Sequence, residues 1–208
     1  IADVALETKT PQLALTPIGL PPGKDAYSFR MPQSNGVMAT AIVAHMQKQG
    51  IKTVGFLGYT DAYGEQWLQA FTPLAEKAGI KIVGVERFAR TDTSVTAQAL
   101  KLVAANPDAM LIVASGSGAA MPHKGIVERN FKGKIYQTHG AASKDLMRVG
   151  GKDVEGAFVV AGPVIAPTQL PDSNPSKKIA ISFAEKYDKA YGAGTANQFA
   201  GHAHDVIV

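Results

Sequence analysis

The regular alternation of short apolar stretches with amphipathic stretches restricts the possible folds of this chain more than any other feature. The apolar stretches predict strands, and the stretches with helical spacing predict helices that connect them. Strands are expected at 12–15, 27–31, 53–57, 81–85, 109–114, 134–137 and 157–161, and helices at 34–49, 64–78, 94–105, 118–129, 144–149 and 175–191. Strands joined by helices predict right-handed crossovers. We therefore predict an α/β fold with three α/β/α layers around an open, mostly parallel sheet.

Two proline-rich connections interrupt this alternation. They cover residues 17–25 and 162–175, on either side of the predicted βα core. Proline-rich irregular stretches are typical of boundaries between compact parts of a chain. The first residues have the pattern of the end of a helix, and the last residues that of a helix beginning. We therefore expect the chain to be a fragment of a longer protein.

The composition excludes several classes of protein. No apolar run in the 208 residues approaches the ~20 that a membrane-spanning helix requires. The net charge is +4, but lysine and arginine are scattered, which argues against a nucleic-acid partner. The absence of cysteine excludes disulfides, thiolate metal sites and cysteine nucleophiles. This composition fits a soluble protein exported by a bacterium.

Polar and aromatic residues follow several of the predicted strands. In an open parallel sheet, ligands bind outside the carboxyl ends of the strands, so these residues are expected on one rim. Hydroxyl groups, aromatic rings, backbone amides and an imidazole together suit a small polar ligand. The candidate ligand-binding residues are Thr16, Tyr59, Tyr63, Ser115, Gly116 and His139.

Each of these features also has a purely structural explanation. Asp61 has the position of a helix cap, with Tyr63 packing on the sheet. The turn that begins at Ser115 is also compatible with a generic tight connection between a strand and a helix. His139 is also compatible with a hydrogen-bonded loop histidine. The sequence leaves these alternatives open.

Several catalytic or metal-binding patterns are almost present but incomplete. Gly116-Ser117-Gly118 follows a strand but lacks the third glycine of a dinucleotide fingerprint. Ser115 and His139 are a possible nucleophile and base, but no nucleophile elbow is present. His202 and His204 are two residues apart, so they diverge on a helix. We therefore expect no catalytic residue, no cofactor and no metal site.

Four stretches of the sequence together resemble a known family. They are GYTDAYGEQW, RTDTSVTAQALKLVAANPDAMLIVASGSGAAMPHK, KIYQTHGAASKDLMRVGGKDVEGAFVVAGP and LPDSNPSKKIAISFAEKYDKAYG. The chain is similar to type I periplasmic substrate-binding proteins of ABC transporters, the leucine/isoleucine/valine-binding type. The resemblance implies two α/β lobes with ligand bound in the cleft between them. Residues 1–31 would be the end of the first lobe and a crossing strand, 32–161 a nearly complete second lobe, and 162–208 a returning hinge segment and helices.

The resemblance also implies roles for single residues. Thr16 matches the loop that grips the ligand carboxylate, and Tyr63 matches a tyrosine that lines the cleft, with Tyr59 beside it. Ser115 or Gly116 occupies the place of an aromatic residue that covers the ligand. His139 stands where amino-acid binders carry an acid for the α-ammonium group. Since imidazole cannot replace a carboxylate there, a carboxylate ligand without an amine becomes credible.

From this resemblance we expect a monomeric, periplasmic, non-enzymatic receptor of an ABC importer. It would bind a hydrophobic amino acid or a small, possibly aromatic, carboxylate and deliver it to the permease. One alternative is a ligand-sensing domain of a receptor or regulator with the same fold. A less favoured alternative is an α/β hydrolase-like enzyme that uses Ser115 and His139.

Overall fold

A computed structural model describes residues 1–16, 18–20 and 22–207 of the chain. Contacts divide the chain into two compact units. One is Asn35–Val160, and the other combines Ile1–Ser34 with Ala161–Val208. We call them the βα unit and the terminal unit. Pro17 and Pro21, in the first proline-rich connection, lie outside the described residues.

The βα unit contains one sheet of five parallel strands, in the order β4-β3-β5-β6-β7. The strands are β3 (Thr53–Tyr59), β4 (Lys81–Phe88), β5 (Ala109–Val113), β6 (Lys134–Gln137) and β7 (Phe158–Val159). A helix connects each strand to the next along the chain, as a parallel sheet requires. The predicted α/β fold with an open parallel sheet is confirmed.

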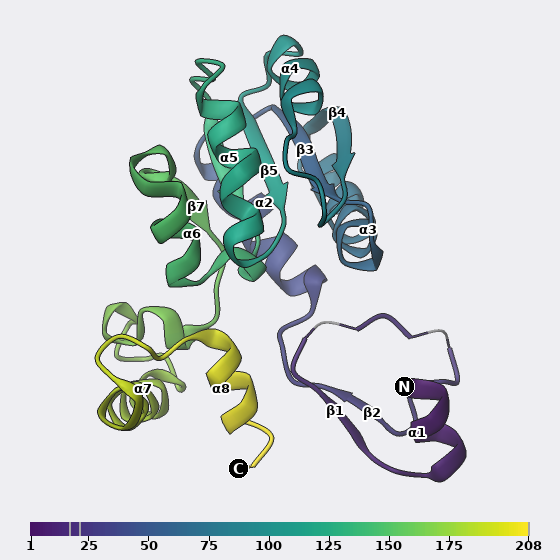
Figure 1. Cartoon of the computed structure of the whole chain (residues 1–208), viewed down its shortest axis with the longest axis vertical. Helices are drawn as coiled ribbons and strands as arrows, with labels where there is room; N and C mark the ends of the chain where they lie inside the picture. The colour runs from purple at the N-terminus through teal and green to yellow at the C-terminus, as the bar shows by residue number, and fades with distance from the viewer. Residues whose placement is uncertain (17, 21, 208) are drawn as a thin grey trace. The chain divides into compact units, whose positions relative to one another are not determined.

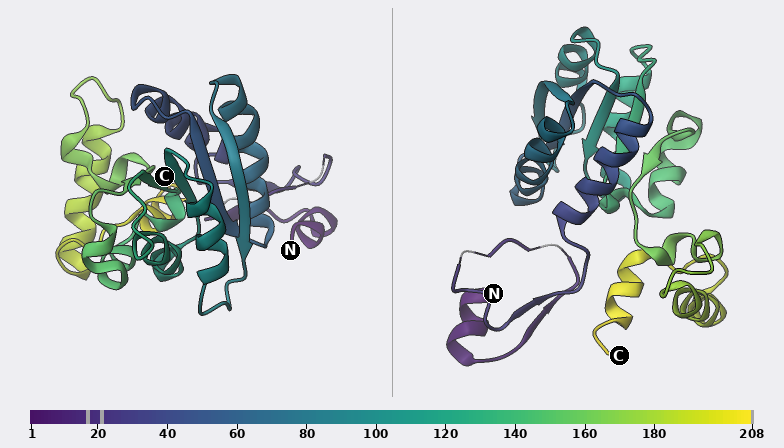
Figure 2. Two further views of the ribbon diagram at one scale, coloured as in Figure 1. Left: turned by 90° about the horizontal axis from the view of Figure 1, so that it is seen from above. Right: turned by 180° about the vertical axis from the view of Figure 1, so that it is seen from behind.

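Helices cover both faces of this sheet. They are α2 (Asn35–Lys48), α3 (Ala62–Lys77), α4 (Thr96–Ala104), α5 (Ala120–Val127) and α6 (Lys144–Gly150). Figure 1 shows α4 and α5 on one face, and the view from behind in Figure 2 shows α2 on the other. The fully buried strand β5 divides its side chains between two hydrophobic clusters. Leu111 and Val113 pack with α2 and α3, whereas Met110 and Ile112 pack with the helices of the opposite face.

Asp108 fixes the amino ends of β3 and β5. Its Oδ2 accepts hydrogen bonds from the backbone N–H groups of Lys52 and Thr53, both at 2.8 Å, and from Thr53 Oγ1 at 3.0 Å. The backbone N–H of Asp108 donates back to Thr53 Oγ1 at 2.9 Å. These bonds set the register of two neighbouring strands, and so they align the opposite, carboxyl ends.

Two strands extend further than the sequence predicts. β3 ends at Tyr59 rather than Leu57, and β4 ends at Phe88 rather than Val85. The helix expected at 118–129 begins as a 3₁₀ turn, η1 (Gly116–Ala119), before α5. The longer β4 places Arg90 directly beyond a strand end.

The terminal unit is smaller and more open. It comprises α1 (Ala2–Thr8), the parallel pair β1 (Gln12–Ala14) and β2 (Ser28–Arg30), the 3₁₀ turns η4 (Pro163–Ile165) and η5 (Pro167–Gln169), α7 (Lys177–Tyr191) and α8 (Gln198–His204). Large apolar side chains remain exposed here, among them Phe29, Ile179 and Tyr191. Within the described ranges, no helix is long and apolar enough to cross a membrane.

Candidate functional site

The carboxyl ends of β3, β4, β5 and β6 form the candidate site, which we call the rim. The turns after these strands are connected by side-chain hydrogen bonds. Tyr63 Oη and Thr138 Oγ1 are 2.8 Å apart and join the ends of β3 and β6. Arg90 Nη1 donates to Ser115 Oγ at 3.1 Å and joins the ends of β4 and β5. Five of the six residues predicted from the sequence lie on or directly beneath this rim.

The turn between β3 and α3 depends on Asp61 and Gly64. Asp61 caps α3, because its Oδ1 accepts from the N–H groups of Tyr63 at 3.0 Å and Gly64 at 3.3 Å. A Cβ at Gly64 would lie 1.9 Å from the carbonyl oxygen of Tyr59, a distance that no side chain tolerates. Only glycine therefore lets the first turn of α3 lie against the end of β3.

Tyr63 is partly buried between the two hydrophobic clusters. A Cβ at Gly140 would lie 2.7 Å from the Tyr63 hydroxyl, so a glycine there makes room for this group. Burial raises the pKa of Tyr63 to about 12, against the smaller opposing effect of its hydrogen bonds, among them that to Thr138. The phenol is therefore neutral at physiological pH.

Tyr59 lies beneath the surface of the rim. Its side chain is 4% exposed, and its ring centroid is 4.9 Å from that of Phe88. The guanidinium carbon of Arg90 covers the ring at 4.1 Å from the centroid. The backbone N–H of Ser115 donates to the Tyr59 hydroxyl at 3.4 Å. Tyr59 therefore supports the turn after β5, and its predicted contact with ligand stays a prediction.

His139 lies in the 3₁₀ turn η2 (His139–Ala141) directly after β6. It is 1% exposed and lies between two aromatic side chains. Its ring centroid is 5.6 Å from that of Trp67 and 6.1 Å from that of Tyr63. The imidazole thus forms part of the packed floor of the rim.

The turn after β5 carries Ser115 and Gly116. Ser115 is partly exposed, with its Oγ bonded to Arg90. Gly116 has a φ of +52°, in the left-handed region that favours glycine. Apart from its two chain neighbours, no residue has an atom within 4 Å of the place where a Cβ would be. The turn is therefore not packed against another element at Gly116.

Arg90 was not predicted from the sequence. Its Nε donates to Asp61 Oδ2 at 2.6 Å, and this ion pair is partly exposed. Burial opposes the charge of Asp61, but the hydrogen bonds from Arg90 and from the N–H groups of Gly64 and Tyr63 outweigh it, so the pKa of Asp61 lies below its usual value. The extended length of β4 was the missing signal, because a strand ending at Val85 does not bring Arg90 to the rim.

Thr16 belongs to the terminal unit and is exposed directly after β1. The carbonyl oxygen of the preceding Leu15 lies 3.3 Å from Nδ1 of His202 in α8. A carbonyl oxygen only accepts, so Nδ1 of His202 carries the hydrogen. His202, which the sequence left without a role, thus holds the backbone beside Thr16.

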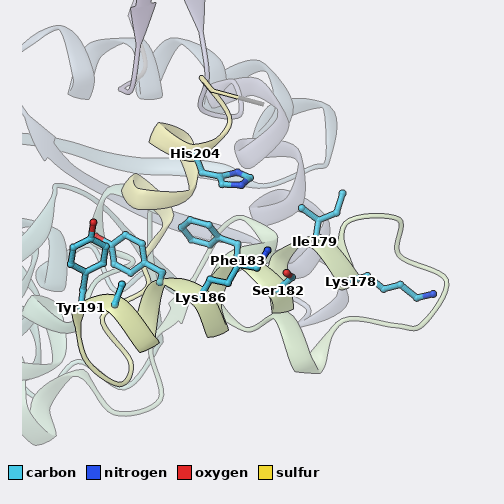
Figure 3. Close-up of a pocket in the computed structure, with 9 residues that line it drawn as sticks. Lys178, Ile179, Ser182, Phe183, Lys186, Tyr191 and His204 are labelled. Atoms are coloured by element: carbon cyan, nitrogen blue, oxygen red, sulfur yellow. The ribbon is translucent and has the colours of Figure 1, made fainter.

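A hollow of about 550 Å³ lies in the terminal unit, along α7 and the end of α8. Figure 3 shows Phe183 and His204 close together in its lining, and their ring centroids are 5.0 Å apart in an edge-to-face arrangement. Tyr187 and Tyr191 continue the aromatic lining. His202 and His204 point to different partners, and among the described residues no three acidic or histidine side chains lie close enough to hold a metal ion.

Comparisons with known proteins agree on one family. A family model for periplasmic binding proteins matches residues 1–207. An extracellular ligand-binding receptor from Rhodopseudomonas palustris is 46% identical, with a TM-score of 0.95; the match covers 99% of this chain and 57% of that one. A second such receptor, from strain HaA2 of that species, is 35% identical over 99% of this chain and 58% of its own, with a TM-score of 0.90.

A leucine-binding protein from Thermotoga maritima has the same fold. It is 23% identical, with a TM-score of 0.84, over 100% of this chain and 57% of its own. No curated protein matches the chain. The chain thus spans little more than half the length of these solved structures.

Proposed function

The chain belongs to the periplasmic binding protein family, and on this premise we propose that it is the ligand-binding part of a receptor for a small organic acid. Its 46% identity to an extracellular ligand-binding receptor supports binding rather than catalysis as the activity. The family and this neighbour also support a location outside the cytoplasmic membrane.

The pairing of Asp61 with Arg90 is the observation that carries the choice of ligand. The turns at 60–64, 89–95, 115–118 and 138–143 contain two acidic residues. Asp92 accepts from the backbone N–H of Ala89 at 2.7 Å, and the other is Asp61. Its carboxylate already accepts from Tyr63 N–H, Gly64 N–H and Arg90 Nε. An α-ammonium group needs an acceptor and a compensating negative charge. The charge of Asp61 is already compensated by Arg90, which favours a ligand without an amine.

The buried His139 supports the same choice. Its ring is buried between Trp67 and Tyr63 and carries no carboxylate that could pair with an ammonium group. Neither the neutral nor the protonated ring attracts an ammonium group as a carboxylate would. The ring of Tyr63, which is only partly buried, suits the apolar part of an aromatic or branched aliphatic acid.

A thermal-shift screen of the full-length protein tests this proposal. The panel sets leucine, valine, phenylalanine and glutamate against benzoate, cinnamate and 4-methyl-2-oxopentanoate. A ligand at ~100 times its Kd stabilises the folded state by about 2.7 kcal/mol, which such a screen detects. We expect the amine-free acids to raise the melting temperature. A shift with the amino acids alone would contradict the proposed ligand class, and no shift at all would count against the receptor function.

Delivery to an ABC permease is the further part of the proposal. It rests on family membership, since periplasmic receptors of this type hand their ligand to a membrane complex. Uptake of a radiolabelled acid that binds in the screen should fall in a strain without the gene. It should return on complementation with the wild-type gene but not with a variant that has lost binding. Unchanged uptake in the deletion strain would favour the ligand-sensing alternative.

A further inference from the structure

A chain of hydrogen bonds connects three neighbouring strand ends on the rim. Arg90 follows β4, Asp61 follows β3 and Ser115 follows β5. Arg90 Nε donates to Asp61 Oδ2 at 2.6 Å, and Arg90 Nη1 donates to Ser115 Oγ at 3.1 Å. Arg90 therefore has a defined position between two turns, although half of its side chain, 51%, is exposed.

The chemistry of arginine fixes the direction of the bond to Ser115. A guanidinium group has five N–H donors and no acceptor, so the Ser115 oxygen must accept. The hydroxyl hydrogen of Ser115 is then available to another group. A ligand therefore meets one donor and one remaining lone pair at this hydroxyl, and the N–H donors of Arg90 beside it disfavour a donor-only ammonium group.

Arg90 has further N–H groups that can donate hydrogen bonds beside the Ser115 hydroxyl. The two bonds to Asp61 and Ser115 use two of its five N–H groups. Stacking over the Tyr59 ring at 4.1 Å holds the guanidinium plane in place. The remaining N–H groups belong to a side chain that is half exposed.

We propose that Arg90 and Ser115 form a donor pair that binds an acceptor oxygen of the ligand and rejects a donor-only ammonium group. Ser115 donates to the ligand oxygen, and Arg90 occupies one of the two lone pairs through which Ser115 would accept from an ammonium group. The acceptor is a carboxylate, keto or phenolate oxygen. This inference rests on the proposed function and adds a residue that sets its specificity.

Matched ligand pairs test the inference in the full-length protein. The pairs are 4-methyl-2-oxopentanoate with leucine, and phenylpyruvate with phenylalanine. Each pair shares a carbon skeleton and differs by a keto oxygen or an ammonium group. Titration calorimetry should show that the wild type prefers the keto acid at least ~10-fold. Arg90→Met should reduce this ratio by about 10-fold, which corresponds to ~1.4 kcal/mol.

The variant Arg90→Lys gives a second test that keeps the positive charge. Lysine lacks the fork that reaches Asp61 and Ser115 together, so it should also lose the preference for the keto acid. Ser115→Ala should reduce the ratio similarly. The double variant Arg90→Met with Ser115→Ala should lose little more than either single variant, because the two residues act as one unit.

Arg87→Met is the matched control. Arg87 lies in β4 with similar exposure and pairs with Glu65 on α3, away from Ser115. Its substitution should leave the keto-to-amino ratio unchanged. If keto acids are preferred but Arg90→Met leaves the ratio intact, the inference is wrong and the proposed function stands. If no member of either pair and no acid of the screen binds, both are wrong.

Discussion

The two units of the chain differ in how completely they bury their apolar side chains. The βα unit contains both hydrophobic clusters, one on each face of its sheet, with Trp67, Phe71 and Leu111 at 0% exposure. In the terminal unit Phe29 is 49% exposed and Tyr191 is 69% exposed. Similar apolar side chains are thus part of a closed core in one unit and of an open surface in the other.

The residues of the βα unit are thus sufficient to bury its own apolar side chains, whereas the described residues of the terminal unit are not. Both faces of a parallel sheet must be covered, and in the βα unit helices from residues 35–160 cover them. Among the described residues, the three-residue pairing of β1 with β2 and the aromatic hollow along α7 are not covered by helices on both faces. The solved relatives are longer than this chain, which spans 57% of the first of them.

The strongest test of this comparison is a pair of aromatic truncations. Phe71→Ala in the βα unit should lower the free energy of unfolding by about 3–5 kcal/mol, because it leaves a cavity in a closed core. Tyr191→Ala in the terminal unit should change it by less than ~1 kcal/mol, because that side chain is mostly exposed. Chemical denaturation of both variants measures the two values, and equal losses would remove the distinction.

Two glycines sharpen the comparison at the backbone. Gly64→Ala should cost about 3 kcal/mol or more, since its Cβ would collide with the Tyr59 carbonyl oxygen at 1.9 Å. Gly162→Ala in the terminal unit meets the end of the Gln33 side chain at 3.0 Å, which can move aside. Thermal melts should therefore separate the two variants clearly. A mild effect at Gly64 would mean that α3 shifts easily.

Ligand binding offers a third comparison. Tyr63→Ala should weaken binding of an acid found in the screen by at least ~1 kcal/mol, as loss of an aromatic contact would. Tyr191→Ala, in the other unit's exposed aromatic surface, serves as the control and should bind normally. Calorimetry on folded protein gives both constants. Wild-type affinity in Tyr63→Ala would place Tyr63 outside the site.

The smallest expected effect concerns Asp108. The backbone N–H groups of Lys52 and Thr53 lower its pKa below the usual 3.8. A depressed folded pKa adds stability that is complete above 3.8 and disappears as the pH falls through the folded value. Asp108→Asn should therefore cost about 1 kcal/mol at pH 7, and this cost should decrease as the pH falls below 3.8.

Asp172→Asn is the counterpart in the terminal unit. The Asp172 side chain is 99% exposed and pairs with Lys177, so its loss should not be measurable at any pH. Denaturation between pH 2 and pH 7 tests both variants. If the loss of unfolding free energy in Asp108→Asn stayed constant with pH, this would contradict the hydrogen bonds assigned to Asp108.

Much of the fold could be predicted because its signals are local. The all-apolar stretch at 109–114 indicated a strand buried on both faces, and β5 is fully buried. Asp61 caps α3, which is the structural role that the sequence offered for it. The motifs also predicted the family, which the family model confirms. The predicted strand ends were less accurate. Charged residues such as Glu86 and Arg87 carry no local strand signal, and they belong to β4 because they pair with β3.

The sequence by itself determined the α/β class, the mostly parallel sheet and the turns that carry polar residues. These features depend on apolar periodicity, helix caps and glycines, which act over a few neighbouring residues. Only the tertiary structure decided which of those residues meet. Arg90 joins Asp61 and Ser115 from 25 or more residues away, Tyr59 and His139 lie beneath the surface, and His202 reaches Leu15 across the chain. Such contacts depend on how the strands are paired and staggered, which no local pattern specifies.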